Sequence, residues 1–282
     1  MREIPENWSE RIPKNVSPKR QTALFRGAFH EGLLESGFAC MGDPLLLGYA
    51  PRPIELAQMC RYARLTVGGV LQTVCLDMRG ILADEDRFDR NARGAALNIC
   101  LWSLKEQLPS NPHYFWTCGF SQQGVTDFCY PGMEADFKPS FISLYCDDFP
   151  FALGLEKELF FERTLPFLDV HTTTEALASW WMQTLNPRRQ MTARPDRAIW
   201  PQLEARRWED AQACVDMGLA RLAEIRSDES YKARWYELQG LITRRSSADA
   251  DSLIAANRAA NQTLLPTLLP GLFPQLMDKA GL

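Results

Sequence analysis

The sequence predicts an α+β protein, in which strands and helices mix in the first half and helices dominate the second. The stretch LTVGGVLQTVCLDM at 65–78 is rich in β-branched residues and contains a Gly-Gly pair, which is typical of a strand hairpin or a bulge. Beyond about residue 150, apolar residues recur every three or four positions over 203–225, 229–242 and 249–265. We therefore expect an antiparallel or mixed sheet with packed helices, followed by a helical part.

Three regions are expected along the chain. Residues 1–18 contain three prolines, which interrupt helices, and are predicted to form a flexible leader. Residues 19–165 are predicted to form the α+β region. Residues 166–282 are predicted to be helical and to pack on the first region as one compact unit, since short loops join antiparallel helices.

Each element of the α+β region has its own signal. TALFRGAFHEGLLESGF at 22–38 predicts a helix that Gly37 ends. LLLGYA at 45–50 predicts a strand, and PIELAQMCRYA at 53–63 predicts a helix with proline in its first turn. Two further strands are expected at 113–120 and 140–146. One apolar stripe predicts a helix over 91–108, and its members are Leu97, Cys100, Leu101, Leu104 and Leu108.

The helical part contains less regular segments as well. TTTEALASWWMQTL at 172–185 predicts a helix whose threonines serve as N-caps, with one of Trp180 and Trp181 buried and the other partly exposed. The basic stretch 187–201, with Arg188, Arg189, Arg194 and Arg197, is expected to be a solvated connector, and phosphate binding is the alternative. The apolar LLPTLLPGLFP at 264–274 is expected to wrap around the domain rather than meet a partner.

Composition excludes several classes of protein. The 282 residues are 46% hydrophobic and 23% charged, which is ordinary for a folded protein, and the net charge is −4. Neither half of the chain is basic, so the positive surface that a nucleic-acid-binding protein needs is not expected. A polar N-terminus and the lack of a run of about 18 apolar residues point to the cytoplasm and exclude a membrane partner.

Metal and cofactor sites are not expected either. The 8 cysteines form no C-x-x-C pair, and the 3 histidines lie far apart in the sequence. The glycine-rich motifs that bind nucleotides and the common hydrolase and metalloprotease motifs are absent from the sequence.

Two pairs of residues could suggest catalysis, but the first pair is too widely separated and the second lacks a nucleophile. His113 and Cys118 lie on opposite faces of a strand and about 16 Å apart, too far for a catalytic dyad. We expect Cys118 to be buried, although His30 or His171 could still reach it. Asp169 and His171 would share a face of an extended chain but lack a nucleophile. No catalytic residue is assigned.

Two acidic clusters are the candidate partner-binding residues. LADEDRFDR at 82–90 contains Asp84, Glu85, Asp86 and Asp89, which form either a solvated loop or a patch that docks on a basic surface. Asp147 and Asp148 follow the strand at 140–146, where they either cap a turn or support acid–base or metal chemistry.

A mildly acidic α+β chain with these features resembles bacterial immunity proteins, which neutralise toxins of type VI secretion and polymorphic-toxin systems. The resemblance rests on ALFRGAFHEGLLESGF at 23–38, the strands at 65–78 and the acidic loop at 82–89. It implies a non-enzymatic protein that covers the active site of a cognate toxin, such as a nuclease with a basic cleft. The alternatives are a small-molecule enzyme with an acidic site near Asp147 and Asp148, and a helical scaffold protein.

Overall fold

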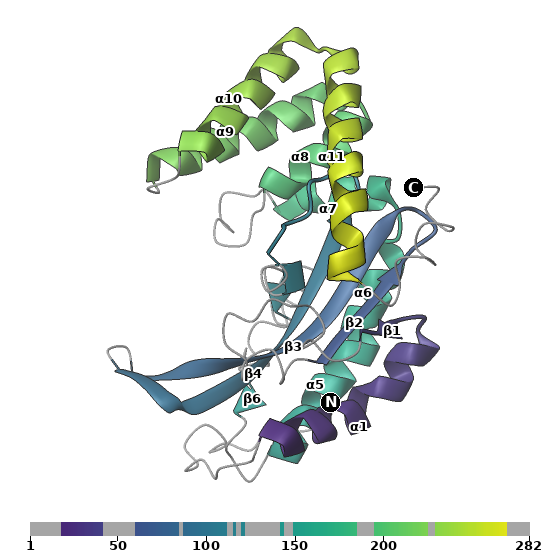
Figure 1. Ribbon diagram of the computed structural model, residues 1–282, viewed down its shortest axis with the longest axis vertical. Coiled ribbons are helices and arrows are strands. Elements are labelled where there is room, and N and C mark those ends of the chain that lie inside the picture. Colours follow the sequence, from purple (N-terminus) through teal and green to yellow (C-terminus); the bar gives the residue numbers. More distant parts are fainter. Residues whose placement is uncertain are drawn as a thin grey trace.

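The computed structural model has the predicted α+β fold, with an antiparallel sheet in the N-terminal half and helices after it (Figure 1). The structure describes residues 18–41, 60–84, 87–111, 115–116, 120–121, 142–143, 149–184, 195–224 and 229–269. The predicted leader lies outside this part of the chain except for Pro18, which begins the first helix.

The sheet is antiparallel in every pair that the structure describes. Neighbouring strands follow chain order from β1 to β5, and β6 also pairs with β4. The strands are β1 (Ala39–Cys40), β2 (Cys60–Leu65), β3 (Val70–Asp84), β4 (Arg87–Ser103), β5 (Phe120–Ser121) and β6 (Ile142–Ser143).

The predicted hairpin at 65–78 is confirmed. β2 and β3 pair through Leu65 and Leu71, and the turn between them contains Gly68 and Gly69. Gly69 has φ +80°, a conformation that glycine adopts at little cost. Gly68 bridges to Thr173 so closely that any side chain on it would clash with the Thr172 carbonyl. This turn therefore docks the hairpin onto the helical part.

The helix predicted over 91–108 is wrong, because this segment forms most of β4. Both faces of β4 are buried: Ile99 and Leu101 belong to one core cluster, and Cys100 and Trp102 belong to the other. A strand covered on both sides is a nearly continuous apolar run, and such a run also places leucines at helical spacing. The long antiparallel pairing with β3 is what makes this segment a strand.

Two more predictions about this half need correction. The helix predicted over 53–63 is wrong at its end, because Cys60–Leu65 is strand β2, which pairs along its length with β3. The strand predicted over 113–120 is wrong at Phe115 and Trp116, which lie in a helical turn where the Phe115 N–H bonds the Asn111 carbonyl. Of the strand predicted over 140–146, Ile142–Ser143 is confirmed as β6, whereas the strand predicted at 45–50 lies outside the described residues.

The helices largely follow the sequence pattern. The first helix is confirmed and ends before Gly37, which has φ +80°. The helices predicted at 172–185, 203–225, 229–242 and 249–265 are confirmed, the second of these being divided between α8 and α9. The elements are α1 (Pro18–Glu35), α5 (Phe149–Leu159), the π-helical turn η3 (Phe160–Thr164), α6 (Leu165–Val170), α7 (Thr174–Thr184), α8 (Pro195–Glu204), α9 (Trp208–Glu224), α10 (Glu229–Arg244) and α11 (Ser247–Leu268).

The solvated connector predicted over 187–201 is wrong at its end, because α8 begins at Pro195. Proline suits the first helical turn, where its missing N–H costs no hydrogen bond. Arg197 is consequently buried inside the fold, with 2% of its surface exposed. Arg188, Arg189 and Arg194 lie outside the described residues.

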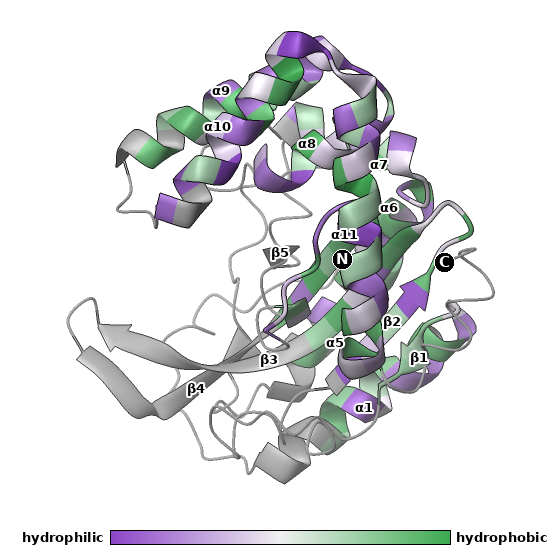
Figure 2. Cartoon of the chain, turned by 45° about the horizontal axis from the view of Figure 1, so that its top comes forward, coloured by the Kyte–Doolittle hydropathy of each residue, from purple (hydrophilic) through white to green (hydrophobic). Residues whose placement is uncertain are grey.

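Two apolar clusters cover the two faces of the sheet. The larger joins one face to helices from both halves of the chain, including Phe29 of α1 and Phe160 of η3. The smaller joins the other face to Leu265 and Leu268 of α11. Figure 2 shows hydrophobic and hydrophilic residues alternating along α9, α10 and α11, as amphipathic helices require.

Adjacent tryptophans and the apolar C-terminal stretch also pack into these clusters. Trp180 and Trp181 are both buried, so the expectation that one ring would be partly exposed is wrong. Their rings lie 4.5 Å apart, and α8 covers the second. Leu265, Leu268 and Leu269 are buried, as wrapping of this stretch predicts, while 270–274 lies outside the described residues.

Candidate functional site

A pocket of about 230 Å³ lies where the end of β4 and the loop after it meet α8 and α10. β4 and the loop contribute Trp102 and Glu106, α8 contributes Arg197 and Trp200, and α10 contributes Arg234 and Trp235. Gln107, also on the lining, is exposed, and Arg234 is half-buried. These two residues mark the side of the pocket that faces solvent.

The loop after β4 is a tight turn built by Ser103 and Glu106. The Ser103 N–H donates to Glu106 Oε1 at 2.9 Å, and the Glu106 N–H donates to the Ser103 carbonyl at 3.1 Å. The Ser-x-x-Glu spacing favours such reciprocal bonds. Asn261 of α11 fixes the loop further, because its Nδ2 donates to the Leu104 and Glu106 carbonyls and its Oδ1 accepts the Leu108 N–H. The position of the Glu106 carboxylate is thus set by its own backbone and by α11.

Glu106 forms a buried ion pair with Arg197. Arg197 Nε lies 3.1 Å from Glu106 Oε2, and the two side chains are 2% and 4% exposed. Arg197 Nη2 also donates to Glu106 Oε1 at 3.4 Å and to the Leu101 carbonyl. Burial raises the pKa of Glu106, and the Arg197 charge and the Ser103 N–H oppose this rise. The ion pair joins the loop after β4 to α8.

Aromatic rings surround both guanidinium groups. Arg197 lies 3.8 Å from the ring centroid of Trp102 and 5.3 Å from that of Trp181. Arg234 lies 5.1 Å from the ring centroid of Trp200, and its Nη1 donates to Gln107 Oε1 at 3.1 Å. Cation–π contacts of this kind hold a guanidinium in place while leaving its N–H groups free to donate.

Two buried donors on the pocket lining have no hydrogen-bond partner among the described residues. They are Arg197 Nη1 and Trp102 Nε1. A buried donor left without an acceptor costs about 1–3 kcal/mol, so such groups usually have a partner. Both oxygens of Glu106, in contrast, already accept bonds. Each of the two donor atoms has less than 1 Å² of accessible surface, so neither is open to the pocket, and the half-buried charged residues on the lining are Asp196 and Arg234.

Asp84 and Asp89, the described acidic residues of the cluster at 82–90, lie on the β3–β4 hairpin, which extends away from the body of the protein (Figure 1). Asp84 is the last residue of β3 and is paired in register with Arg87 of β4, and Asp89 follows in β4. Glu85, Asp86, Asp147 and Asp148 lie outside the described residues. Of the two predicted acidic clusters, the described part of the chain therefore contains Asp84 and Asp89.

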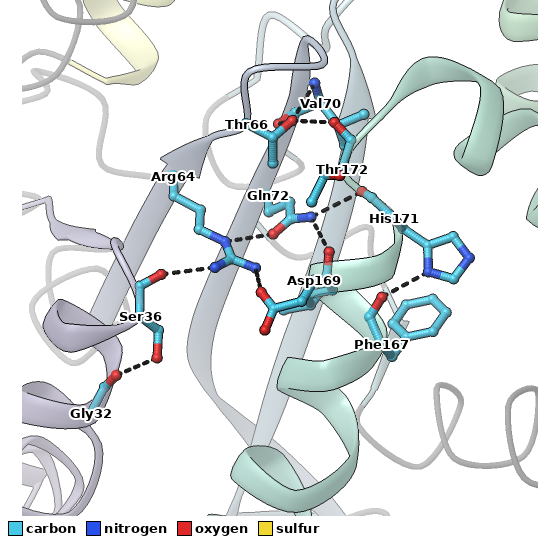
Figure 3. A network of polar contacts seen from close by, with 11 residues as sticks. Gly32, Ser36, Arg64, Thr66, Val70, Gln72, Phe167, Asp169, His171 and Thr172 are labelled. Carbon is cyan, nitrogen blue, oxygen red and sulfur yellow. Dashed lines mark hydrogen bonds and ion pairs between the residues drawn. The ribbon is translucent and has the colours of Figure 1, made fainter.

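Asp169 and His171 do not form a pair, because each bonds a different group (Figure 3). Asp169 Oδ1 accepts from Arg64 Nη2 at 2.6 Å, whereas His171 Nδ1 donates to the Phe167 carbonyl at 2.7 Å. Burial lowers the pKa of His171, and the bond to Phe167 opposes this. His30 Nδ1 lies 3.0 Å from the Tyr62 hydroxyl, while His113 and Cys118 lie outside the described residues.

The same network joins the β2–β3 hairpin to the end of α6 (Figure 3). Gln72 Nε2 donates to the Leu168 carbonyl at 2.7 Å and to the His171 carbonyl at 3.0 Å. Gln72 Oε1 accepts from Arg64 Nε at 2.7 Å, and Thr66 Oγ1 donates to the Thr172 carbonyl at 2.6 Å. These bonds satisfy carbonyls that a helix end leaves open, which is a structural role.

Sequence reasoning missed the pocket because its parts are far apart in the chain. The sequence pattern predicts Arg197 as one of several solvated arginines and places Glu106 within the helix predicted over 91–108. Two local signals pointed the other way: the Ser103-x-x-Glu106 spacing, and a proline at 195 ahead of the apolar residues Ala198 and Ile199. Only the fold shows that the resulting turn and helix meet.

The comparisons with known proteins supply no relative. The sequence matches no protein-family model and no curated protein, and the fold matches no solved structure. Within the described ranges, no three or more acidic, histidine or cysteine side chains gather in a way that would hold a metal ion. No helix in this part of the chain is long and apolar enough to cross a membrane.

Proposed function

We propose that this protein is a binding protein whose pocket between β4, α8 and α10 holds an anionic group of a ligand. The observation that carries the proposal is Arg234, a half-buried arginine on the pocket lining that Trp200 and Gln107 hold in place. A carboxylate can accept from its guanidinium, and bonds from a guanidinium to an anion are stronger than bonds between neutral groups.

An aromatic lining also suits a cation, and here the contacts argue against one. The protein's own Arg197 lies over Trp102, and Arg234 lies over Trp200. A cationic ligand would have to approach these positive charges, whereas an anion would be attracted to them.

The test is calorimetric titration of the full-length protein with acetate, phosphate and tetramethylammonium at constant ionic strength. We expect an anion to bind to wild type and Arg234→Gln to weaken it about 3- to 10-fold, since one charged donor is lost. Binding by the cation alone, or no anion binding at millimolar concentration, would contradict the proposal. Circular dichroism and thermal unfolding check that the variant folds.

A second candidate function is the immunity role that the sequence suggests, and the β3–β4 hairpin is the observation that favours it. The hairpin extends away from the body (Figure 1), and Asp84 and Asp89 lie on its two strands near the tip. A protruding acidic element suits insertion into a basic cleft. The acidic loop would then cover the active site of a cognate toxin.

Co-expression tests this second candidate. A toxic protein encoded beside this chain should lose its toxicity when wild type is co-expressed, and regain it with the double variant Asp84→Asn, Asp89→Asn. The matched double variant Asp216→Asn, Asp251→Asn, on exposed helical positions, should still protect the cells. Failure of wild type to protect would exclude the role.

A cytoplasmic location is part of the same proposal. Cys214 is a buried free cysteine, and burial raises the pKa of its thiol, which keeps the thiol protonated. Free buried cysteines are common in reducing compartments. An enzymatic site at Asp147 and Asp148 stays an alternative, since both residues lie outside the described part of the chain.

A further inference from the structure

The part of the pocket lining that a ligand can reach consists of four side chains. Gln107 is exposed, and Pro109, Asp196 and Arg234 are half-buried. The other residues on the lining are buried and therefore closed to direct contact with a ligand. Recognition in this pocket must come from one positive charge, one negative charge, one amide and one proline ring.

The two accessible charges lie beside the same tryptophan. Asp196 and Trp200 are four residues apart on α8 and therefore lie on the same face of that helix. The Arg234 guanidinium lies 5.1 Å from the ring centroid of Trp200. Within the described part of the chain Arg234 forms no ion pair, and its hydrogen bond goes to the neutral Gln107. Its charge is thus not neutralised by Asp196, although both residues line one small pocket.

The buried charges of the lining determine what the accessible ones can bind. Glu106 is neutralised by its ion pair with Arg197. Burial raises the pKa of Glu106, and the charge of Asp196 adds to this rise, so the two carboxylates lie near each other. An anion held at Arg234 would consequently be repelled by Asp196. A positive group on the same ligand would turn this repulsion into attraction.

The size of the pocket limits the ligand to a small molecule. Its volume is about 230 Å³. A protein cavity of about 150 Å³ accommodates benzene, and pockets for drug-sized ligands measure about 300–1,000 Å³. An amino acid with a small side chain fits between these limits. Its carboxylate and its ammonium group are attached to one carbon atom, which suits two opposite charges that lie beside one tryptophan.

We propose that the ligand of this pocket is a small α-amino acid, with its carboxylate bound by Arg234 and its ammonium group bound by Asp196. This inference rests on the proposed anion-binding function and specifies its ligand class. Both contacts are charge-assisted hydrogen bonds, and their opposite signs fix the orientation of the ligand. Gln107 contributes by holding the guanidinium in place.

Calorimetric titration at pH 7 and constant ionic strength with three matched probes tests the ligand class. Alanine should bind at least about tenfold more tightly than propionate, which has the carboxylate and lacks the ammonium group. Alanine should also bind at least about tenfold more tightly than alaninamide, which has the ammonium group and lacks the carboxylate. The three probes are similar in size, so the differences report charge.

Two variants assign the two ends of the ligand. Asp196→Asn should weaken alanine about tenfold or more and should not weaken propionate, which has no group for Asp196 to bind. Arg234→Gln should weaken alanine and propionate alike, because both present a carboxylate. Both variants keep the ion pair between Arg197 and Glu106, so both should fold, and thermal unfolding checks this.

Each variant has a matched control outside the pocket. Asp210→Asn removes a half-buried carboxylate from the first turn of α9, just as Asp196→Asn does in α8, and should leave alanine binding unchanged. Arg244→Gln, on the same helix as Arg234, should also leave it unchanged. These controls separate the loss of a ligand contact from the loss of a favourable charge at a helix end.

The possible results separate this inference from anion binding. If propionate binds as tightly as alanine, or Asp196→Asn weakens both equally, the amino acid is excluded and anion binding stands. If alaninamide binds as tightly as alanine, the carboxylate is not recognised, and both proposals fail. They also fail if neither alanine nor propionate binds at millimolar concentration.

Discussion

Two arginines occupy backbone conformations that usually require glycine. Arg206 and Arg245 have φ 58° and 49°. Arg206 lies two residues after the end of α8, and Arg245 directly follows the end of α10. The Arg245 N–H bonds the Ile242 carbonyl, as in the usual left-handed helix ending. Each also forms an ion pair, Arg206 with Asp251 and Arg245 with Glu209. The two contacts tie neighbouring helices together, at the cost of backbone strain.

Replacing Arg245 with glycine should stabilise the protein. Glycine removes the strain of the left-handed conformation, while the ion pair with Glu209 is 63% and 75% exposed and contributes little. We expect the free energy of unfolding in urea to rise by roughly 0.5–1 kcal/mol. The control is Arg244→Gly, one residue earlier and inside α10, which should lower it by about 1 kcal/mol. Equal losses for both variants would contradict this account.

Glu156 should make stability depend on pH. It is buried in α5, and burial raises its pKa to about 8. The unfolded chain releases this proton near pH 4.5, so between pH 4.5 and 8 the folded state holds more protons, and the free energy of unfolding falls as pH rises. Glu156→Gln removes this loss.

The variant Glu156→Gln should therefore be more stable than wild type by roughly 2–4 kcal/mol at pH 9, and by little at pH 4. Urea unfolding at the two pH values measures the difference. Glu162→Gln, at an exposed position on η3, should show no such change with pH. A Glu156→Gln advantage that is the same at both pH values would show that the carboxyl does not hold its proton in the folded state.

At the scale of elements, the network around Gln72 determines how the hairpin is attached to α6 (Figure 3). Gln72→Met keeps the side-chain volume and removes the amide that bonds the Leu168 and His171 carbonyls. We expect a loss of about 2–3 kcal/mol in the free energy of unfolding, since buried acceptors lose their donors. Gln183→Met, at an exposed position of α7, should change it by less than about 0.5 kcal/mol. A similar effect of both variants would show that the network adds no stability.

Elements were predictable from the sequence where one face of the segment is buried and the other is exposed. The helices α9, α10 and α11 have this pattern, and their existence follows from it. β4 does not have this pattern, because its residues 97–103 are buried on both faces of the sheet. An apolar run without a clear period fits a strand or a helix equally well. The ion pair between Arg197 and Glu106 could not be predicted from the sequence for another reason. Its partners are 91 positions apart in the chain, and each residue type alone is typical of a solvated side chain.

At the scale of the whole molecule, the helical part and the sheet share their apolar cores. Ala198, Ile199 and Leu177 belong to the same cluster as Val70 and Ile99 of the sheet. On the other face, Leu265 and Leu268 of α11 contact a cluster that includes Leu71 and Trp102. α11 lies along the upper part of the sheet in Figure 1. The pocket, whose walls come from β4, α8 and α10, depends on this joining.

A helical scaffold that acts without the sheet is therefore not expected. A fragment of residues 149–282 would expose the apolar faces of α7 and α11 and leave Arg197 without Glu106. We expect this fragment to show no cooperative thermal transition by circular dichroism, whereas the full chain unfolds cooperatively. Mixing it with a fragment of residues 1–148 should restore a cooperative transition, because the two parts complete each other's cores. Cooperative unfolding of the fragment alone, together with near-ultraviolet signals of packed tryptophans, would show that the helical part is an independent domain.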